Sequence, residues 1–156
     1  MIYLVNFTRW VMLIKKVFLG LTLIITMFVS LDTQLQAAQN SHADMGNNHA
    51  KNGNYSQALS SLNTAIQKDP SSARSYKLRG HVYYAMGDYS KALADLDYVV
   101  HLVADSANAL ADRAIVHSVM GNHGLALADI ERALALKPTS SFAESVRKEI
   151  LERARR

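Results

Sequence analysis

The chain of 156 residues is long enough for one domain, with 49% apolar residues, 19% charged residues and a formal net charge of +4. It contains no cysteine, which excludes a disulfide framework, a thiol nucleophile and a thiolate metal site. Basic residues cluster only in the C-terminal tail, so the sequence lacks the basic face that is typical of nucleic-acid-binding proteins.

The N-terminal segment has the parts of a secretory signal peptide. Lys15-Lys16 precede an uncharged apolar run over residues 17–31, and small residues follow at Ala37-Ala38. The run is short for a membrane span, which needs about 20 residues. We therefore expect residues 1–37 to be a bacterial-type signal peptide and the protein to be exported, periplasmic or extracellular. An N-terminal anchor in the inner membrane stays open as the alternative.

The first eleven residues are apolar ahead of these lysines, which is unusual for a signal peptide. A start at Met12 gives the usual basic opening within a few residues. We therefore expect Met12 to be the true start of the protein.

The rest of the chain repeats itself every 34 residues. A fixed period of this length is the signature of a stacked repeat protein. The matching positions are Gly53, Gly87 and Gly121; Tyr55, Tyr89 and His123; Ala58, Ala92 and Ala126; Leu62, Leu96 and Ile130; Ala65, Val99 and Ala133; and, two periods apart, Pro70 and Pro138.

The central copy resembles the tetratricopeptide repeat family, on the residues Tyr76, Gly80, Tyr83, Gly87, Tyr89, Ala92 and Leu96. The resemblance covers residues 39–138. It implies an all-α fold, a right-handed solenoid of three helix–turn–helix repeats that binds peptides or proteins on its concave side. We expect repeats over residues 39–72, 73–106 and 107–140, followed by a capping helix with a basic tail over residues 141–156.

Local signals agree with this division. Gly87 supplies the left-handed residue that ends a first helix, and Asp88, Asn54 and Asn122 are good N-caps for the second helices. Ser72, Ser106 and Ser140 stand where the next first helices begin. The first helix of repeat 1, residues 40–51, is rich in asparagine and glycine, so we expect it to fray.

The C-terminal helix has signals of its own. Residues 141–144, Ser-Phe-Ala-Glu, have the pattern of a capping box. Phe142, Val146 and Ile150 are predicted to form its apolar face. Such a helix, polar on its outer side, is what the end of a solenoid needs for solubility.

Two arginines and two aspartates share repeat positions. Arg79 and Arg113 are 34 residues apart, and so are Asp95 and Asp129, sixteen residues further on. Repeat 1 has Met45 and Ser61 at these positions, so the two charges occur together or are both absent. This pattern predicts structural ion pairs between the two helices of a repeat, Arg79 with Asp95 and Arg113 with Asp129.

Neither a metal site nor a catalytic site is predicted. His49 and His117 fall in the column of Tyr83, and His123 falls in that of Tyr89, so they are interpreted as substitutes in aromatic packing positions. The six histidines lack zinc-ligand spacing. The sequence has no phosphate-binding loop, nucleophile elbow or HExxH motif. We expect no cofactor, no metal and no enzymatic activity.

The functional prediction is a non-catalytic interaction module. The resemblance implies that Lys77, His81 and Tyr84 line the concave groove, with Tyr84 as the anchor. The counterparts are Ala43, Asn47 and Ala50 in repeat 1, and Ala111, Ile115 and Ser118 in repeat 3. The predicted partner is a protein or peptide and not nucleic acid.

Two alternatives stay open: a structural subunit that self-associates or packs in an envelope complex through its ends or residues 142–156, and membrane-surface attachment through residues 17–31 and the basic tail. One family subtype is disfavoured, the clamp for acidic carboxyl ends of chaperones. Its basic positions hold Ala43, Asn47, Asn108 and Asp112 here.

Overall fold

The computed structural model describes residues 20–31, 33–34 and 42–155. The chain divides into two units, Met1–Ala38 and Gln39–Arg156. Met12, Lys15-Lys16 and the expected cleavage site at Ala37-Ala38 lie outside the described residues. Within those residues, no helix is both long and apolar enough to cross a membrane.

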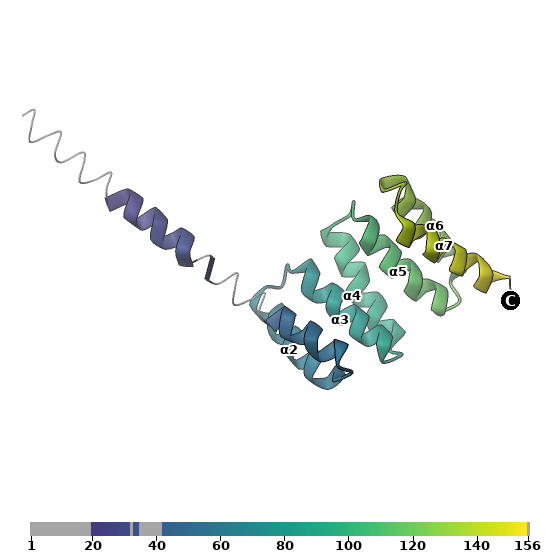
Figure 1. Cartoon of the computed structure of the whole chain (residues 1–156), viewed down its shortest axis with the longest axis horizontal. Coiled ribbons are helices and arrows are strands. Elements are labelled where there is room, and N and C mark those ends of the chain that lie inside the picture. The colour runs from purple at the N-terminus through teal and green to yellow at the C-terminus, as the bar shows by residue number, and fades with distance from the viewer. Residues whose placement is uncertain (1–19, 32, 35–41, 156) are drawn as a thin grey trace, which may run out of the picture. The chain divides into compact units, whose positions relative to one another are not determined.

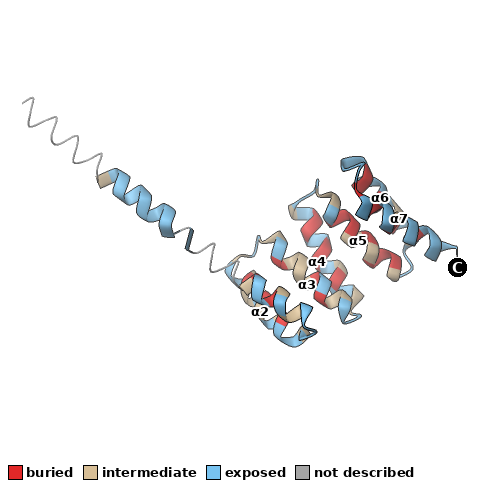
Figure 2. Cartoon of the chain, in the orientation of Figure 1, coloured by how far each residue is buried: buried red, intermediate tan, exposed pale blue. Residues whose placement is uncertain are grey.

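The first unit contains a helix over residues 20–31 that buries almost nothing. Figure 2 shows it as exposed along nearly its whole length. Its polar side chains bond to its own backbone: Thr26 Oγ1 donates to the carbonyl of Leu23 at 2.9 Å, and Ser30 Oγ donates to that of Met27 at 2.9 Å. The helix thus presents an apolar surface on all sides.

The second unit is a stack of helices (Figure 1). A helix over residues 42–51 pairs with α2, α3 pairs with α4, and α5 pairs with α6, while α7 follows the last pair. The labelled helices are α2 (Tyr55–Lys68), α3 (Ala73–Ala85), α4 (Tyr89–Leu102), α5 (Ala107–Val119), α6 (His123–Leu136) and α7 (Ser141–Ala154). All regular elements among the described residues are helices. The prediction of an all-α solenoid of helix–turn–helix units is confirmed.

The turn inside each pair depends on glycine. Gly53, Gly87 and Gly121 have φ angles of 76°, 81° and 81°. This is the left-handed region, which costs side-chain-bearing residues about 1–2 kcal/mol. The three glycines therefore end the first helix of each pair and let the second helix fold back.

The core is built from the repeated small and branched residues. Ala58, Ala92 and Ala126 are fully buried, and so are Leu62 and Ile130. These positions lie on the second helices, facing the first helix of the same pair. Their burial explains why the 34-residue period is so regular there.

Small residues on the first helices let the two helices of a pair approach. A Cβ on Gly46 would lie 2.6 Å from Leu62 Cγ, and one on Gly80 would lie 3.2 Å from Leu96 Cγ. Residues 42–51 are helical, and Ala43 is 2% exposed. The glycine that lowers the helix propensity of this segment is thus required by its packing.

The N-caps separate into two groups. Ser72, Ser106 and Ser140 each accept a hydrogen bond from the backbone N–H three residues further on. Asp88 does the same for α4. Asn54 and Asn122 occupy the N-cap positions of α2 and α6 but make no side-chain cap bond to the described backbone. All three predicted residues stand at the N-caps of the second helices, but only Asp88 caps its helix through its side chain.

Two expectations for α7 also need correction. The N-cap is Ser140, whose Oγ accepts from the Ala143 N–H at 3.2 Å. The third helical position therefore holds Ala143, and the predicted capping box of Ser141 and Glu144 is wrong. The buried face consists of Ala143, Val146 and Ile150, whereas Phe142 is 46% exposed beside it.

Candidate functional site

Two clusters of side-chain hydrogen bonds, each centred on an arginine, join the helices of the stack. Arg79 on α3 donates from Nε and Nη2 to the two carboxylate oxygens of Asp95 on α4, at 2.8 and 2.7 Å. Its Nη1 donates to Asn63 Oδ1 on α2 at 2.7 Å. The hydrogen bonds that Arg79 donates to Asp95 raise the pKa of Arg79, although burial opposes this effect. One side chain therefore joins three helices.

The same arrangement recurs one period later. Arg113 on α5 donates from Nε and Nη2 to Asp129 on α6, both at 2.7 Å, and from Nη1 to Asp97 on α4 at 2.9 Å. The hydrogen bonds that Arg113 donates to Asp129 raise the pKa of Arg113, against the effect of burial. The fork geometry uses the planar guanidinium bidentately. Because all three guanidinium nitrogens donate to acceptors within the fold, this cluster holds the fold together.

A third arginine belongs to this series and was missed from the sequence. Arg147 on α7 is 34 residues after Arg113 and contacts Glu131 on α6 at 3.6 Å and Glu144 on its own helix at 2.9 Å. The 34-residue spacing was the available signal. It identifies α7 as equivalent to α3 and α5, the first helices of their pairs; we call the first helix of each pair, and α7, a first-type helix.

The open polar surface lies along the first-type helices. His81 on α3 contacts Asp112 on α5, with 3.2 Å between Nε2 and Oδ2. The ring of Tyr84 packs against that of Tyr89 with centroids 5.6 Å apart, and it is partly exposed. Lys77 is partly buried, and no described side chain pairs with its ammonium. Asn47, on the helix over residues 42–51, is partly exposed.

The expected third part of the groove is closed. Ser118 is 5% exposed, and Ile115 is partly buried against the core. Both line a small hollow together with Val146, Glu149 and Ile150 of α7. The interpretation of Ser118 as an open groove residue was therefore wrong, because α7 covers it.

Both ends of the stack carry polar residues where interior helices are apolar or small. The position held by Val82, Val116 and Ile150, all nearly fully buried, is occupied in the first helix pair by Asn48, which is exposed. The position held by Gly46, Gly80 and Ala114 is occupied in α7 by Lys148, which is exposed. These polar residues suit contact with solvent and disfavour packing against a further repeat.

The histidines do not form a metal centre in the described part of the chain, where no three metal-ligating side chains converge. His117 is 9% exposed, and its Nδ1 has no hydrogen-bond partner among the described residues. His123 Nδ1 is also buried without a hydrogen-bond partner among the described residues. Both occupy the packing positions that hold Tyr83 and Tyr89 in the second helix pair.

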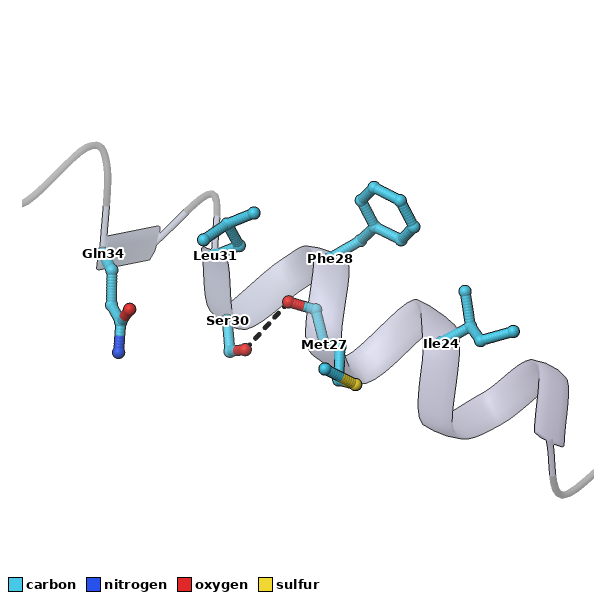
Figure 3. A pocket seen from close by; sticks show the side chains of 6 residues that line it. All are labelled: Ile24, Met27, Phe28, Ser30, Leu31 and Gln34. Carbon is cyan, nitrogen blue, oxygen red and sulfur yellow. Dashed lines mark hydrogen bonds between the residues drawn. The ribbon is translucent and has the colours of Figure 1, made fainter.

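An apolar hollow lies on the N-terminal helix and is lined by Ile24, Met27, Phe28, Ser30, Leu31 and Gln34 (Figure 3). All six come from residues 20–34 of one segment, and in Figure 3 their side chains project outward. This is the surface of a single helix, so it lacks the opposing wall of a binding pocket.

Comparisons with known proteins agree with this geometry. A family model described as "TPR repeat" matches residues 46–87, and one described as "Tetratricopeptide repeat" matches residues 77–141. No curated protein matches the chain.

Three solved structures share the fold. The first TPR of Spaghetti (RPAP3) bound to HSP90 peptide SRMEEVD is 22% identical over 73% of this chain and 90% of that one, with a TM-score of 0.69. The Arabidopsis OM64 TPR domain is 19% identical over 76% and 98%, with a TM-score of 0.70. The second TPR domain of human RPAP3, in complex with HSP70 peptide SGPTIEEVD, is 25% identical over 75% and 98%, with a TM-score of 0.69.

Proposed function

Because this chain belongs to the tetratricopeptide repeat family over residues 46–141, we propose that it is a non-catalytic module that holds a peptide segment of another protein in the groove along its first-type helices. The observation that carries the proposal is the presence of Lys77 and Tyr84 on one face of α3, about two helical turns apart. Lys77 has no partner among the described residues, and Tyr84 keeps part of its ring exposed. A cation and a partly exposed aromatic ring on one helix face suit a polar peptide with an apolar anchor.

The partner differs in chemistry from the chaperone peptides that the RPAP3 domains bind. Those peptides, SRMEEVD and SGPTIEEVD, end in acidic residues. At the positions of the family's carboxylate clamp this chain has Ala43, which is buried, and Asp112, which contacts His81. A carboxylate would meet repulsion at Asp112, so we expect such peptides not to bind.

A crosslinking experiment tests the groove. A photo-crosslinking residue in place of Tyr84 is expected to capture a partner in the native host, and the same residue in place of Ser90, exposed on α4, is not. Adding Lys77→Glu should abolish the capture. Lys91→Glu, at an exposed lysine on α4, is the matched control and should leave it unchanged. The same capture from both sites, or capture that survives Lys77→Glu, would contradict the proposal.

The second candidate is a subunit that assembles through α7. Phe142 and Leu151 on this helix are 46% and 40% exposed, which favours an additional contact there. Light scattering of the wild type and of Phe142→Ser/Leu151→Ser tests it. A larger wild-type species that falls to the mass of a monomer in the double variant would support assembly. A monomer in both cases would exclude it.

We also propose that the N-terminal segment directs export, to the periplasm or the outside, with an inner-membrane anchor as the alternative. The helix over residues 20–31 supports this, since it exposes Leu23, Ile24 and Phe28, among others, and satisfies its hydroxyls internally. Such a surface needs an apolar environment. N-terminal sequencing of the purified protein is expected to begin at residue 38 or 39. An intact start at Met1 or Met12 would point to the anchor instead.

A further inference from the structure

The groove continues beyond the three helix pairs onto α7. Three groove positions recur there at the 34-residue spacing: Lys77 is matched by Ser145, His81 by Glu149 and Tyr84 by Glu152. The Ser140 cap and Arg147 place α7 in the same register as α3 and α5. Glu149 lines a hollow with Ile115 and Ser118 of α5, so the exposed side chains of α7 continue the row where α7 covers Ser118.

The charges along this row are not evenly compensated. Two polar groups in its middle are satisfied within the chain, because His81 contacts Asp112 and Glu149 accepts from Arg153 at 2.8 and 3.0 Å. Lys77 on α3 and Glu152 on α7 have no pairing partner among the described residues. The groove therefore has an unpaired cation toward one end and an unpaired anion toward the other.

The separation of these two charges sets the spacing in a ligand. They lie on α3 and α7, two helix positions apart with α5 between them. Packed helices have axes about 8–10 Å apart, which gives roughly 16–20 Å across the two steps. Glu152 also lies seven repeat positions further along its helix than Lys77 does, which adds an offset of about 10 Å along the helix axis. An extended peptide advances about 3.3 Å per residue, so the combined distance of roughly 19–23 Å corresponds to about six or seven residues.

Apolar side chains also lie between the two charges, beside the polar groups that are satisfied within the chain. The partly buried rings of Tyr84 and Tyr89 lie on one side, and the partly buried Ile115 lies on the other. Resting on the proposed function, we infer that the groove selects an extended segment with an acidic side chain over Lys77, an apolar one near Tyr84 and a basic one over Glu152. Opposite charges at a partly desolvated surface give register and specificity.

Capped synthetic peptides provide the probe, because capping removes the terminal charges. One seven-residue peptide has aspartate first, leucine in the centre, arginine last and serine elsewhere; a second has the order reversed; a third has aspartate at both ends. Binding of labelled peptides to the full chain is followed by fluorescence anisotropy. We expect one of the two mixed-charge peptides to bind at least fivefold more tightly than the di-acidic peptide.

Charge exchange in the protein makes the test specific. Lys77→Glu and Glu152→Lys should each weaken the preferred peptide about fivefold to tenfold. The double variant Lys77→Glu/Glu152→Lys should prefer the peptide of opposite order. Lys91→Glu, outside the groove, should change nothing, and circular dichroism checks that each variant is folded. Equal binding of all three peptides, or tightest binding of the di-acidic one, would overturn the inference.

The outcome is separable from that of the proposed function. If the crosslinker at residue 84 captures a partner while no peptide depends on Lys77 and Glu152, the groove is a binding site and the inferred ligand chemistry is wrong. If residue 84 captures nothing and the peptides do not bind, both ideas fail.

Discussion

The first and second helix pairs share the same glycine–leucine contact between their helices but differ in the ion pairs and hydrogen bonds of their polar side chains. Gly46 meets Leu62 in the first pair just as Gly80 meets Leu96 in the second. The ion pair exists only in the second pair, where Arg79 also reaches back to α2. In the first pair Met45 takes the arginine position and is 46% exposed. Small-residue packing thus makes each pair, whereas the arginine joins one pair to the pair before it.

The largest effect is expected from removing an arginine that joins two pairs. Arg113→Ala would leave Asp129, which is 8% exposed, without a counter-charge. An unpaired buried carboxylate is costly, so we expect a loss of about 3 kcal/mol in the free energy of unfolding. Urea denaturation monitored by circular dichroism measures it.

Arg147→Ala is the matched control, at the same repeat position on α7. Its partners Glu131 and Glu144 have side chains 59% and 49% exposed, so the expected loss is below about 1 kcal/mol. Equal losses in the two variants would show that burial of the acidic partner does not decide the effect. Arginine clusters inside the stack would then stabilise it no more than the arginine at its end.

A single substitution at three glycines tests the packing that the pairs share. Gly46→Ala would force its Cβ against Leu62, and we expect a net loss of about 1–2 kcal/mol from overpacking. Gly80→Ala meets Leu96 less closely, so a gain of about 1 kcal/mol in helix propensity should nearly offset the contact. At Gly124 a Cβ meets nothing within 4 Å, so Gly124→Ala should stabilise the protein. Thermal unfolding ranks the three, and any other order would contradict the packing argument.

Much of the stack could be predicted because the residue type at each repeated position reflects how that position packs. Ala92 must be small because it is fully buried at a helix contact. The joint occurrence of Arg79 with Asp95, and of Arg113 with Asp129, pointed to pairing before any distance was known. The reach of each arginine to the preceding helix was missed, although its acceptors recur at the 34-residue spacing as Asn63, Asp97 and Glu131. The change from an amide to carboxylates hides this column from a search for opposite charges.

The groove was harder to predict because it depends on how α7 packs. Ser118 occupies the same repeat position as Tyr84, yet α7 buries it. The predicted apolar face of α7 was right at Val146 and Ile150 and wrong only at Phe142, which is exposed, while Ala143 is buried instead. Residue type alone does not distinguish these two neighbours, because a phenylalanine and an alanine can both end an apolar face.

The smallest effect concerns the caps of the second helices, where the second pair again differs from its neighbours. Asp88 accepts from the Lys91 N–H and from Lys91 Nζ, and this pairing lowers the pKa of Asp88. Asn122 makes no such bond to the described residues. Asn122→Asp should therefore stabilise α6 by about 0.5 kcal/mol, through a charge at the helix N-terminus.

The pH dependence identifies the cause of that gain. A carboxylate whose pKa is lower in the folded protein stabilises it above the unfolded value of about 3.9, and this contribution disappears as the pH falls through the folded value. The difference between Asn122→Asp and the wild type should thus be present at pH 7 and absent at pH 2. A gain that persists at pH 2 would mean that the aspartate acts through backbone conformation and not through its charge. In that case Asp88 would also cap α4 for a reason other than its ionisation.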